Sequence, residues 1–179
     1  MRFTSFYSRL RFVRLHSAPS ARIPLWTESP TFIHFPIIPS TNTWALYEKQ
    51  RLPRRCVSVI SADAQSRGRG SREREWVSPV GNVYCTIAFH TTITHHGSFY
   101  PLVAGLSMAT ALESLGVRGV LLKWPNDLVL NRKKIGGILC EAETYTDTQQ
   151  DDDQRSVFVA VGTGVNLLDK SNTLAAIPR

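Results

Sequence analysis

The stretch that decides the fold is Gln65-Ser-Arg-Gly-Arg-Gly-Ser-Arg-Glu-Arg-Glu-Trp-Val-Ser-Pro-Val-Gly-Asn-Val-Tyr84. Its first half places Gly68 and Gly70 beside arginines, so the backbone can curl round an anionic group that guanidinium groups also reach. Alone, such a loop could equally be an unspecific basic segment or part of a disordered RNA-binding tail. The second half, from Trp76, supplies an aromatic residue, a turn and a strand, which a disordered tail would lack. We therefore predict a phosphate-binding loop that leads straight into a folded sheet.

The segments on either side of this stretch predict a mixture of strands and helices. Before it, a short apolar segment (residues 32–38) precedes Ser40-Thr41-Asn42, three good N-cap residues for a helix that runs through Gln50. A buried strand is expected over 56–60, and a loop over 62–79. After it come a strand at 83–89 and an amphipathic helix that begins near Pro101 and ends at Gly116.

The C-terminal half is richer in strands. Residues 120–124 and 128–130 predict two strands around a polar turn, and residues 134–143 and 157–161 predict two more. An acidic, Gln-rich hairpin loop (144–154) joins the last pair. The pattern indicates an α+β fold in which helices pack on one side of a mixed β-sheet.

Composition and charge favour one soluble domain with a basic leader. The chain of 179 residues is 42% hydrophobic, and no apolar run approaches the roughly 20 residues of a membrane-spanning helix. Five arginines precede Pro24, whereas the first acidic residue is Glu28, so the remainder carries a net charge of only +2 of the total +7. We therefore expect no nucleic-acid partner and no membrane. The three cysteines show no metal-binding spacing and are typical of buried thiols in a reducing compartment.

Residues 1–30 form the leader, which is rich in Arg and Ser and has apolar residues at helical spacing. This composition is typical of an organellar transit peptide, although Arg14 falls on the apolar face. An untranslated start and a disordered tail are the alternatives. The predicted location is accordingly mitochondrial or cytoplasmic, with the mitochondrion favoured by the leader.

Three further motifs carry groups suited to chemistry. Lys123-Trp-Pro-Asn-Asp127 gathers a cation, a ring, an amide and a carboxylate in one tight turn, which could also be a plain hairpin turn. Arg132-Lys-Lys-Ile-Gly-Gly-Ile-Leu-Cys-Glu141 opens a strand with lysines, and its two glycines either admit a ligand to the backbone or mark a bulge. Gly162-Thr-Gly-Val-Asn166 ends a buried strand in a glycine turn that is either ordinary or in contact with a base.

In this order, these segments resemble the catalytic domain of biotin-protein ligases, within the biotin/lipoate A/B protein ligase family. The resemblance covers residues 32–167, so we expect residues 31–179 to form that domain, incomplete at its C-terminus. It implies a class II aminoacyl-tRNA synthetase-like sheet that forms biotinyl-5′-AMP from biotin and ATP. The biotinyl group then passes to a lysine of a biotin carboxyl-carrier domain of acetyl-CoA, propionyl-CoA, methylcrotonyl-CoA or pyruvate carboxylase, and a homodimer is an open expectation.

The resemblance also assigns roles to single residues. Lys134 and Arg69 are the expected catalytic residues, with Lys134 between the biotin carboxylate and the α-phosphate and Arg69 in the loop that orders over the ligand. The implied biotin-binding residues are Ser40, Thr41, Asn42, Gln65, Gly68, Arg69, Gly70, Lys134 and Gly137. The implied nucleotide-binding residues are Trp76, Lys123, Asn126, Asp127 and Asn166, with Asp127 also expected to bind Mg²⁺.

Two features depart from the family pattern. The family usually has an arginine directly after the second glycine of the loop, where this chain has Ser71, although Arg72 follows and could substitute. Without that substitution, we expect leakier release of biotinyl-AMP. The chain also ends at Arg179, sooner than the family pattern, and its leader is too short for a helix-turn-helix, which argues against a repressor role.

Three other functions stay open from the sequence. A lipoate or octanoate ligase would share the fold and the acyl-adenylate chemistry, but its arginine-glycine-glycine signature is not found here. An RNA-binding protein would use the basic loop and leader, against which stands the nearly neutral body. The third alternative is a truncated fragment that binds biotin and does not complete the transfer.

Overall fold

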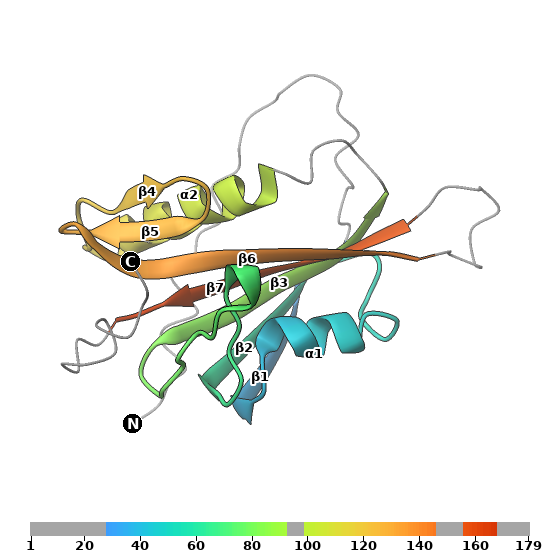
Figure 1. Cartoon of the computed structure of the whole chain (residues 1–179). Helices are drawn as coiled ribbons and strands as arrows, with labels where there is room; N and C mark the ends of the chain where they lie inside the picture. The colour runs from blue at the N-terminus through green and yellow to red at the C-terminus, as the bar shows by residue number, and fades with distance from the viewer. Residues whose placement is uncertain (1–27, 93–98, 146–155, 168–179) are drawn as a thin grey trace, which may run out of the picture.

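A computed structural model describes residues 28–92, 99–145 and 156–167 of the chain. These residues form one seven-stranded sheet and two α-helices (Figure 1). The leader, apart from its last three residues, and most of the acidic Gln-rich loop lie outside the described residues. No helix in the described part is long and apolar enough to cross a membrane. In chain order the elements are β1 (Thr31–Ile38), α1 (Thr41–Tyr47), β2 (Ser58–Gln65), the 3₁₀ turn η3 (Ser71–Glu73), β3 (Val83–Thr92), α2 (Tyr100–Ser114), β4 (Leu121–Lys123), β5 (Asp127–Leu130), β6 (Lys133–Tyr145) and β7 (Ser156–Val165).

The sheet has the strand order β1-β2-β3-β7-β6-β5-β4. Only β1 and β2, which α1 connects, pair in parallel, and the other neighbours are antiparallel. The last strand among the described residues, β7, therefore lies in the centre, bonded to β3 on one side and β6 on the other. The expected mixed α+β sheet is confirmed.

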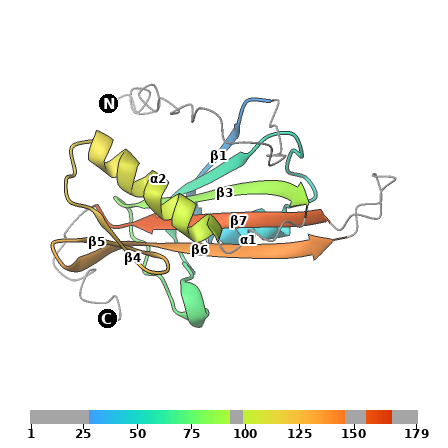
Figure 2. The same ribbon diagram turned by 90° about the horizontal axis from the view of Figure 1, so that it is seen from above.

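The two helices cover opposite faces of the sheet, so the expectation that they share one face is wrong. Val159 and Val161 of β7 belong to the cluster that contains Leu112 of α2. Phe158 and Ala160 belong to the cluster on the α1 side. Because side chains of a strand alternate between faces, a strand that is apolar at successive positions needs cover on both. Figures 1 and 2 show α2 and α1 on either side of the central strands.

Several strands are longer than the sequence predicts. The apolar segment before Ser40 is the edge strand β1, where Pro36 is tolerated because an edge strand has an unpaired side. Strand β2 runs on to Gln65, into the segment expected to be loop, because its last residues pair with β1. Strand β7 runs through both glycines to Val165 and so replaces the predicted glycine turn.

The helices and one turn keep close to their sequence signals. Helix α1 ends at Tyr47, three residues before the predicted end at Gln50. Helix α2 has its proline in the first turn, as expected. Strands β5 and β6 are joined by Asn131 and Arg132, both with positive φ (50° and 62°), which is the geometry of a two-residue type I′ hairpin.

Candidate active site

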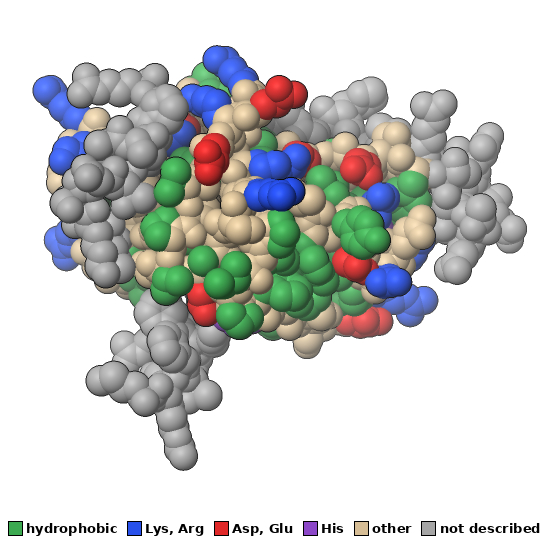
Figure 3. Space-filling view, turned by 60° about the horizontal axis from the view of Figure 1, so that its bottom comes forward, with side chains coloured by type: hydrophobic (Ala, Val, Ile, Leu, Met, Phe, Trp, Pro, Cys, Tyr) green, Lys and Arg blue, Asp and Glu red, His purple; other side chains and the backbone are tan. Residues whose placement is uncertain are grey.

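A pocket lies on the face of the sheet that carries α1, beside the N-terminus of that helix. It is bounded by the segment from Gln65 to Val77, which folds over strands β6 and β7. On the same side of the molecule, basic and acidic side chains are interspersed among hydrophobic ones (Figure 3). The pocket is lined by Ser40, Thr41, Asn42, Gln65, Arg69, Gly70, Ser71, Arg74, Glu75, Trp76, Val77, Asn126, Lys134, Gly137, Ile138, Leu139, Gly162, Thr163 and Gly164.

Two glycines of the central strand β7 make room for the pocket's own side chains. A Cβ atom on Gly162 would lie 2.3 Å from Oδ1 of Asn42, and one on Gly164 would lie 2.5 Å from Nε1 of Trp76. Both approaches are far shorter than van der Waals contact, so these two strand positions exclude any side chain. The bare backbone lets Asn42 and Trp76 lie directly on β7.

The glycine-arginine stretch forms a small hairpin rather than an irregular loop. Gln65 pairs with Ser78 and Arg69 with Glu75 in isolated antiparallel bridges, and the Trp76 backbone N–H donates to the Gly68 carbonyl oxygen (2.9 Å). A Cβ atom on Gly68 would lie 2.2 Å from the Trp76 carbonyl oxygen. Gly68 therefore permits the two arms of the hairpin to meet, and it does not itself line the pocket.

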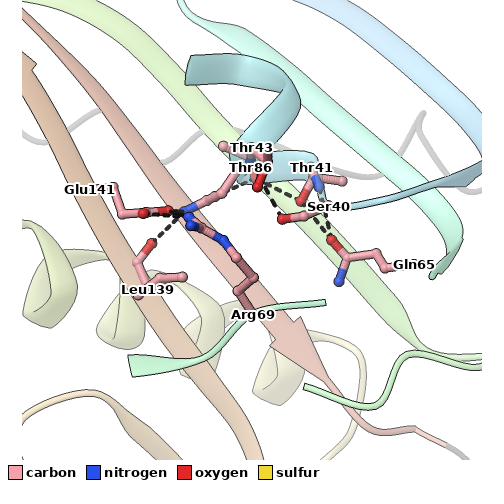
Figure 4. A network of polar contacts seen from close by, with 9 residues as sticks. Ser40, Thr41, Thr43, Gln65, Arg69, Thr86, Leu139 and Glu141 are labelled. Atoms are coloured by element: carbon pink, nitrogen blue, oxygen red, sulfur yellow. Dashed lines mark hydrogen bonds and ion pairs between the residues drawn. The ribbon is translucent and has the colours of Figure 1, made fainter. Parts of the chain in front are cut away.

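The start of α1 is joined to the base of this hairpin by side-chain hydrogen bonds (Figure 4). Ser40 caps the helix by accepting from the Thr43 backbone N–H (3.4 Å). The backbone N–H and the hydroxyl of Thr41 both donate to Oε1 of Gln65, at 2.9 and 3.2 Å. The amide of Gln65 donates in turn to the Ser78 hydroxyl (3.0 Å). Gln65 is thereby held in one orientation and keeps one amide hydrogen for a ligand.

Asn42 is buried, and its side-chain amide is hydrogen-bonded to other residues of the protein. Its Nδ2 donates to the Leu139 carbonyl oxygen (3.0 Å) and to Oε2 of Glu141 (2.9 Å), while its Oδ1 accepts from the Thr86 hydroxyl (2.6 Å). Both N–H donors are therefore used. Asn42 lines the predicted pocket, but these bonds make it a brace between α1, β3 and β6.

Lys134 brings a positive charge to the pocket beside an aromatic ring. Its ammonium lies 2.7 Å from Oδ1 of Asp127 and 5.3 Å from the ring centre of Trp76, within cation–π range. The Lys134 ammonium is also 3.5 Å from where a Cβ of Gly137 would be. A cation held over bare backbone in this way can meet an anionic ligand from one side while Asp127 holds it from another.

Two arginines of the hairpin also line the pocket, Arg69 and Arg74. Arg69 pairs with Glu141 of β6, and Arg74 donates from Nε and Nη2 to the carbonyl and hydroxyl oxygens of Ser71, both at 3.1 Å. Arg72, the suggested substitute for the missing arginine, has positive φ (58°) and does not line the pocket. Of Arg72 and Arg74, it is Arg74 that both donates to Ser71 and lines the pocket.

Of the other predicted nucleotide and metal residues, only Asn126 lies in the pocket. Asn126 lines it and holds β6 by donating from Nδ2 to the Ile138 carbonyl oxygen (2.8 Å). Lys123 and Asp127 line a second cavity, between α2 and the turn at residues 123–127, instead. Asn166 lines neither pocket, but its Oδ1 is buried without a hydrogen-bond partner in the described structure.

No group of three or more His, Cys, Asp or Glu side chains that could bind a metal ion gathers among the described residues. The free cysteines are also unsuited to chemistry. Burial raises the pKa of Cys85 to about 11, and burial together with the Glu141 charge raises that of Cys140 to about 11. Thiols with such pKa values stay protonated and unreactive near neutral pH.

Sequence reasoning missed several residues that shape the pocket. Gly162 and Gly164 stood in a noted motif, but as part of a turn rather than as strand positions that line the pocket. No role was predicted for Thr86 and Glu141, because their hydrogen-bond partner Asn42 is more than 40 residues away in the chain. Alternation along β3 would have placed Thr86 on a buried face, yet no local signal gives its partner.

Comparison with known proteins places this chain in a family. Residues 34–160 match the model of the biotin/lipoate A/B protein ligase family. The bifunctional ligase/repressor BirA of Salmonella typhimurium is 34% identical over 149 residues, which cover 82% of this chain and 43% of that protein. The biotin–[acetyl-CoA-carboxylase] ligase of Paracoccus denitrificans is 35% identical over 66% of this chain and 48% of its own. This chain thus spans less than half of each of these two relatives.

Solved structures give the same result. Biotin protein ligase from Leishmania major, in complex with biotinyl-5-AMP, superposes with a TM-score of 0.60 at 28% identity, covering 77% of this chain and 57% of that one. Biotin acetyl coenzyme A carboxylase synthetase from Helicobacter pylori, with bound biotinylated ATP, gives a TM-score of 0.61 at 27% identity, covering 80% and 64%. The extent of the family match and the identity to BirA show that this chain belongs to the biotin/lipoate A/B protein ligase family.

Proposed function

We propose that this protein activates biotin with ATP and transfers the biotinyl group to a lysine of a carrier domain. The observation that carries the proposal is the Lys134 ammonium, held over the bare backbone of Gly137 and beside the Trp76 ring in the pocket. Its relatives are named as biotin ligases, and two similar structures contain biotinyl-5-AMP or biotinylated ATP. Because the biotin carboxylate and the phosphates of ATP are both anionic, this reaction requires a cation between them.

The end of the pocket at α1 suits the polar head of biotin. A ureido ring carries two N–H donors and one carbonyl acceptor, and it needs partners when it leaves water. Ser40 offers a hydroxyl oxygen, and Gln65 offers its remaining amide hydrogen from a fixed orientation. Biotin would then extend along β6 past Leu139 towards Gly137, with its carboxylate near Lys134.

Electrostatics then accounts for the first step. The biotin carboxylate attacks the α-phosphorus of ATP, a C–O–P bond forms, and pyrophosphate leaves. Negative charge builds on the phosphoryl oxygens as this happens, and Lys134 is already in place to stabilise it; removing one such preorganised group typically costs about 10²–10³-fold in rate. Arg69 and Arg74 add positive charge from the hairpin side.

The nucleotide would occupy the end of the pocket near Trp76. The indole ring lines the pocket and offers a stacking surface for a base. Mg²⁺ commonly binds through one or two carboxylates together with substrate phosphates. The Asp127 carboxylate next to Lys134 fits that mode, and the ion would neutralise phosphate charge there.

In the second step a carrier lysine attacks the carbonyl carbon of biotinyl-AMP, loses a proton, and AMP leaves. The hairpin over the pocket would limit access of water to the anhydride until the lysine arrives. The carrier partners we propose are the biotin carboxyl-carrier domains of acetyl-CoA, propionyl-CoA, methylcrotonyl-CoA or pyruvate carboxylase. The Arg/Ser-rich leader supports a mitochondrial location, with the cytoplasm as the alternative.

The direct test is the intact mass of an apo carrier domain after incubation with this protein, MgATP and biotin, with lipoate in a parallel tube. We expect a gain of one biotinyl group that Lys134→Ala abolishes and that Lys133→Ala, an exposed lysine that lines neither cavity, leaves in place. A gain only with lipoate would indicate the lipoate ligase activity instead. No gain, with biotin still bound, would make the protein a biotin-binding module and refute the ligase proposal.

A further inference from the structure

Among the described residues, two of the three cationic side chains that line the pocket are held by a carboxylate of the protein. Lys134 is paired with Asp127, and Arg69 is paired with Glu141. Asp127 was noted in the sequence, whereas Glu141 received no role. Figure 4 shows the Arg69 side chain reaching from the hairpin across to Glu141 on β6. That contact joins the tip half of the hairpin to the sheet on the far side of the pocket.

Glu141 is itself fixed by the protein interior. Its Oε2 accepts from Nδ2 of Asn42 at 2.9 Å, and Asn42 is buried and bonded to Thr86 and to the β6 backbone. The side chain of Glu141 is 26% exposed, whereas that of Arg69 is 44% exposed. The carboxylate is therefore the anchored partner and the guanidinium the movable one.

We infer that Glu141 is a positioning residue: anchored by Asn42, it holds Arg69 and with it the glycine-arginine hairpin across the pocket. The contact acts on the ligand only through Arg69, since Glu141 does not line the pocket. Its relevance to biotin chemistry rests on the proposed function, while its effect on the hairpin does not. A carboxylate suits this role because a guanidinium can donate to both of its oxygens, which a neutral amide does not offer.

Opening of the hairpin can be measured with trypsin, because trypsin cleaves after arginine and the segment carries Arg67, Arg69, Arg72 and Arg74. When the hairpin opens and closes faster than trypsin cleaves it, the cleavage rate is proportional to the population of molecules with an open hairpin. A partly exposed ion pair contributes up to about 1 kcal/mol, so its loss should raise cleavage roughly fivefold. Mass spectrometry of the fragments separates these cuts from those elsewhere.

The matched control is Glu143→Gln. Glu143 lies two residues further along the same strand and forms an ion pair with Lys49 (2.9 Å) away from the pocket. We expect Glu141→Gln, and not Glu143→Gln, to raise cleavage after Arg67, Arg72 and Arg74. Glu141→Asp, which keeps the charge, should restore part of the protection.

Coupling to Arg69 distinguishes positioning from a general loss of structure. Arg69→Gln should raise cleavage at the three remaining arginines as much as Glu141→Gln does, and the double variant should show no further rise. Equal cleavage in Glu141→Gln and Glu143→Gln, or additive effects in the double variant, would overturn the inference.

A second measurement, calorimetric titration with biotin, connects the contact to the ligand. We expect biotin to bind Glu141→Gln roughly fivefold more weakly than wild type and Glu143→Gln, in line with the same loss of a closed hairpin. If the hairpin opens in Glu141→Gln but biotin binds none of the proteins, Glu141 keeps its positioning role and the proposed function fails. If biotin binds all of them equally, Glu141 does not position Arg69 for the ligand.

Discussion

Replacement of Gly162 by alanine tests whether the pocket floor depends on a bare strand. The added Cβ would lie 2.3 Å from Oδ1 and 2.8 Å from Cγ of Asn42. The backbone cannot yield, because Gly162 pairs with Thr86 of β3 on one side and Leu139 of β6 on the other. Asn42 must move instead, away from its three partners.

The expected loss of stability has two parts. Leaving a buried amide without its hydrogen bonds costs about 1–3 kcal/mol, and forcing an extra carbon into a packed interior costs about 1–3 kcal/mol. The loss of hydrogen bonds and the steric overlap are not fully additive, because each can be reduced at the expense of the other. We therefore expect a total loss of about 2–4 kcal/mol. With a urea m-value of about 2 kcal/mol/M, the unfolding midpoint should fall by about 1–2 M.

Urea unfolding followed by fluorescence measures this loss, with Gly70→Ala as the matched control. A Cβ on Gly70 meets nothing closer than 3.4 Å, and its φ of −114° is open to alanine, so we expect no loss there. Adding Asn42→Ala to Gly162→Ala should recover part of the stability, because alanine removes the clashing amide. A fall below about 0.5 kcal/mol for Gly162→Ala, the range of ordinary surface substitutions, would refute the reasoning.

Three further outcomes are expected. Ser71→Arg should slow the release of biotinyl-AMP, measured as retention of labelled adenylate on a spin column; unchanged retention would show that Arg74 already suffices. Asn126→Ala should lower stability by about 1 kcal/mol in urea, because the Ile138 carbonyl oxygen loses its donor. The pKa values of about 11 for Cys85 and Cys140 lie above the unfolded value, so their protonated forms favour folding below pH 9 and this contribution is lost between pH 9 and 11. The free energy of unfolding should thus fall less steeply between pH 9 and 11 in the double variant Cys85→Ala, Cys140→Ala than in wild type. Parallel curves of stability against pH for the two proteins would contradict the shifted pKa values.

The fold class was predictable from periodicity, whereas strand extent was not. Two helix starts were marked by local signals, Ser40 at one and Pro101 at the other, and both begin where expected. The end of β2 and the end of β7 were missed for one reason. Residues 62–65 and 162–165 are polar or glycine-rich, and they are strands only because neighbours from elsewhere in the chain pair with them.

For the pocket, residue types were predictable and partners were not. Ser40, Thr41, Gln65, Arg69 and Lys134 all line one pocket, as the resemblance implied. Their roles towards biotin and ATP stay predictions.

Other predicted residues contribute in ways that only the structure reveals. Gly68 permits a close contact of the hairpin arms, and Asn42 braces three elements. Lys123 lies at a different cavity. In each case the deciding fact is a distance between segments that are remote in the sequence.

Because β7 lies between β3 and β6 in the sheet, we expect the pocket to be completed late in the folding of this chain. Before β7 inserts, β3 and β6 each present an open edge, and such edges pair readily with other chains. Strands β6 and β7 follow each other in the chain, whereas β3 and β7 are separated by α2 and three strands, and contacts that distant in sequence form slowly because a long loop must close first. A ligand that binds only the completed pocket would draw the equilibrium towards the inserted strand. Biotin supplied during expression should therefore raise the yield of soluble protein, which links nutrient supply to the survival of newly made chains.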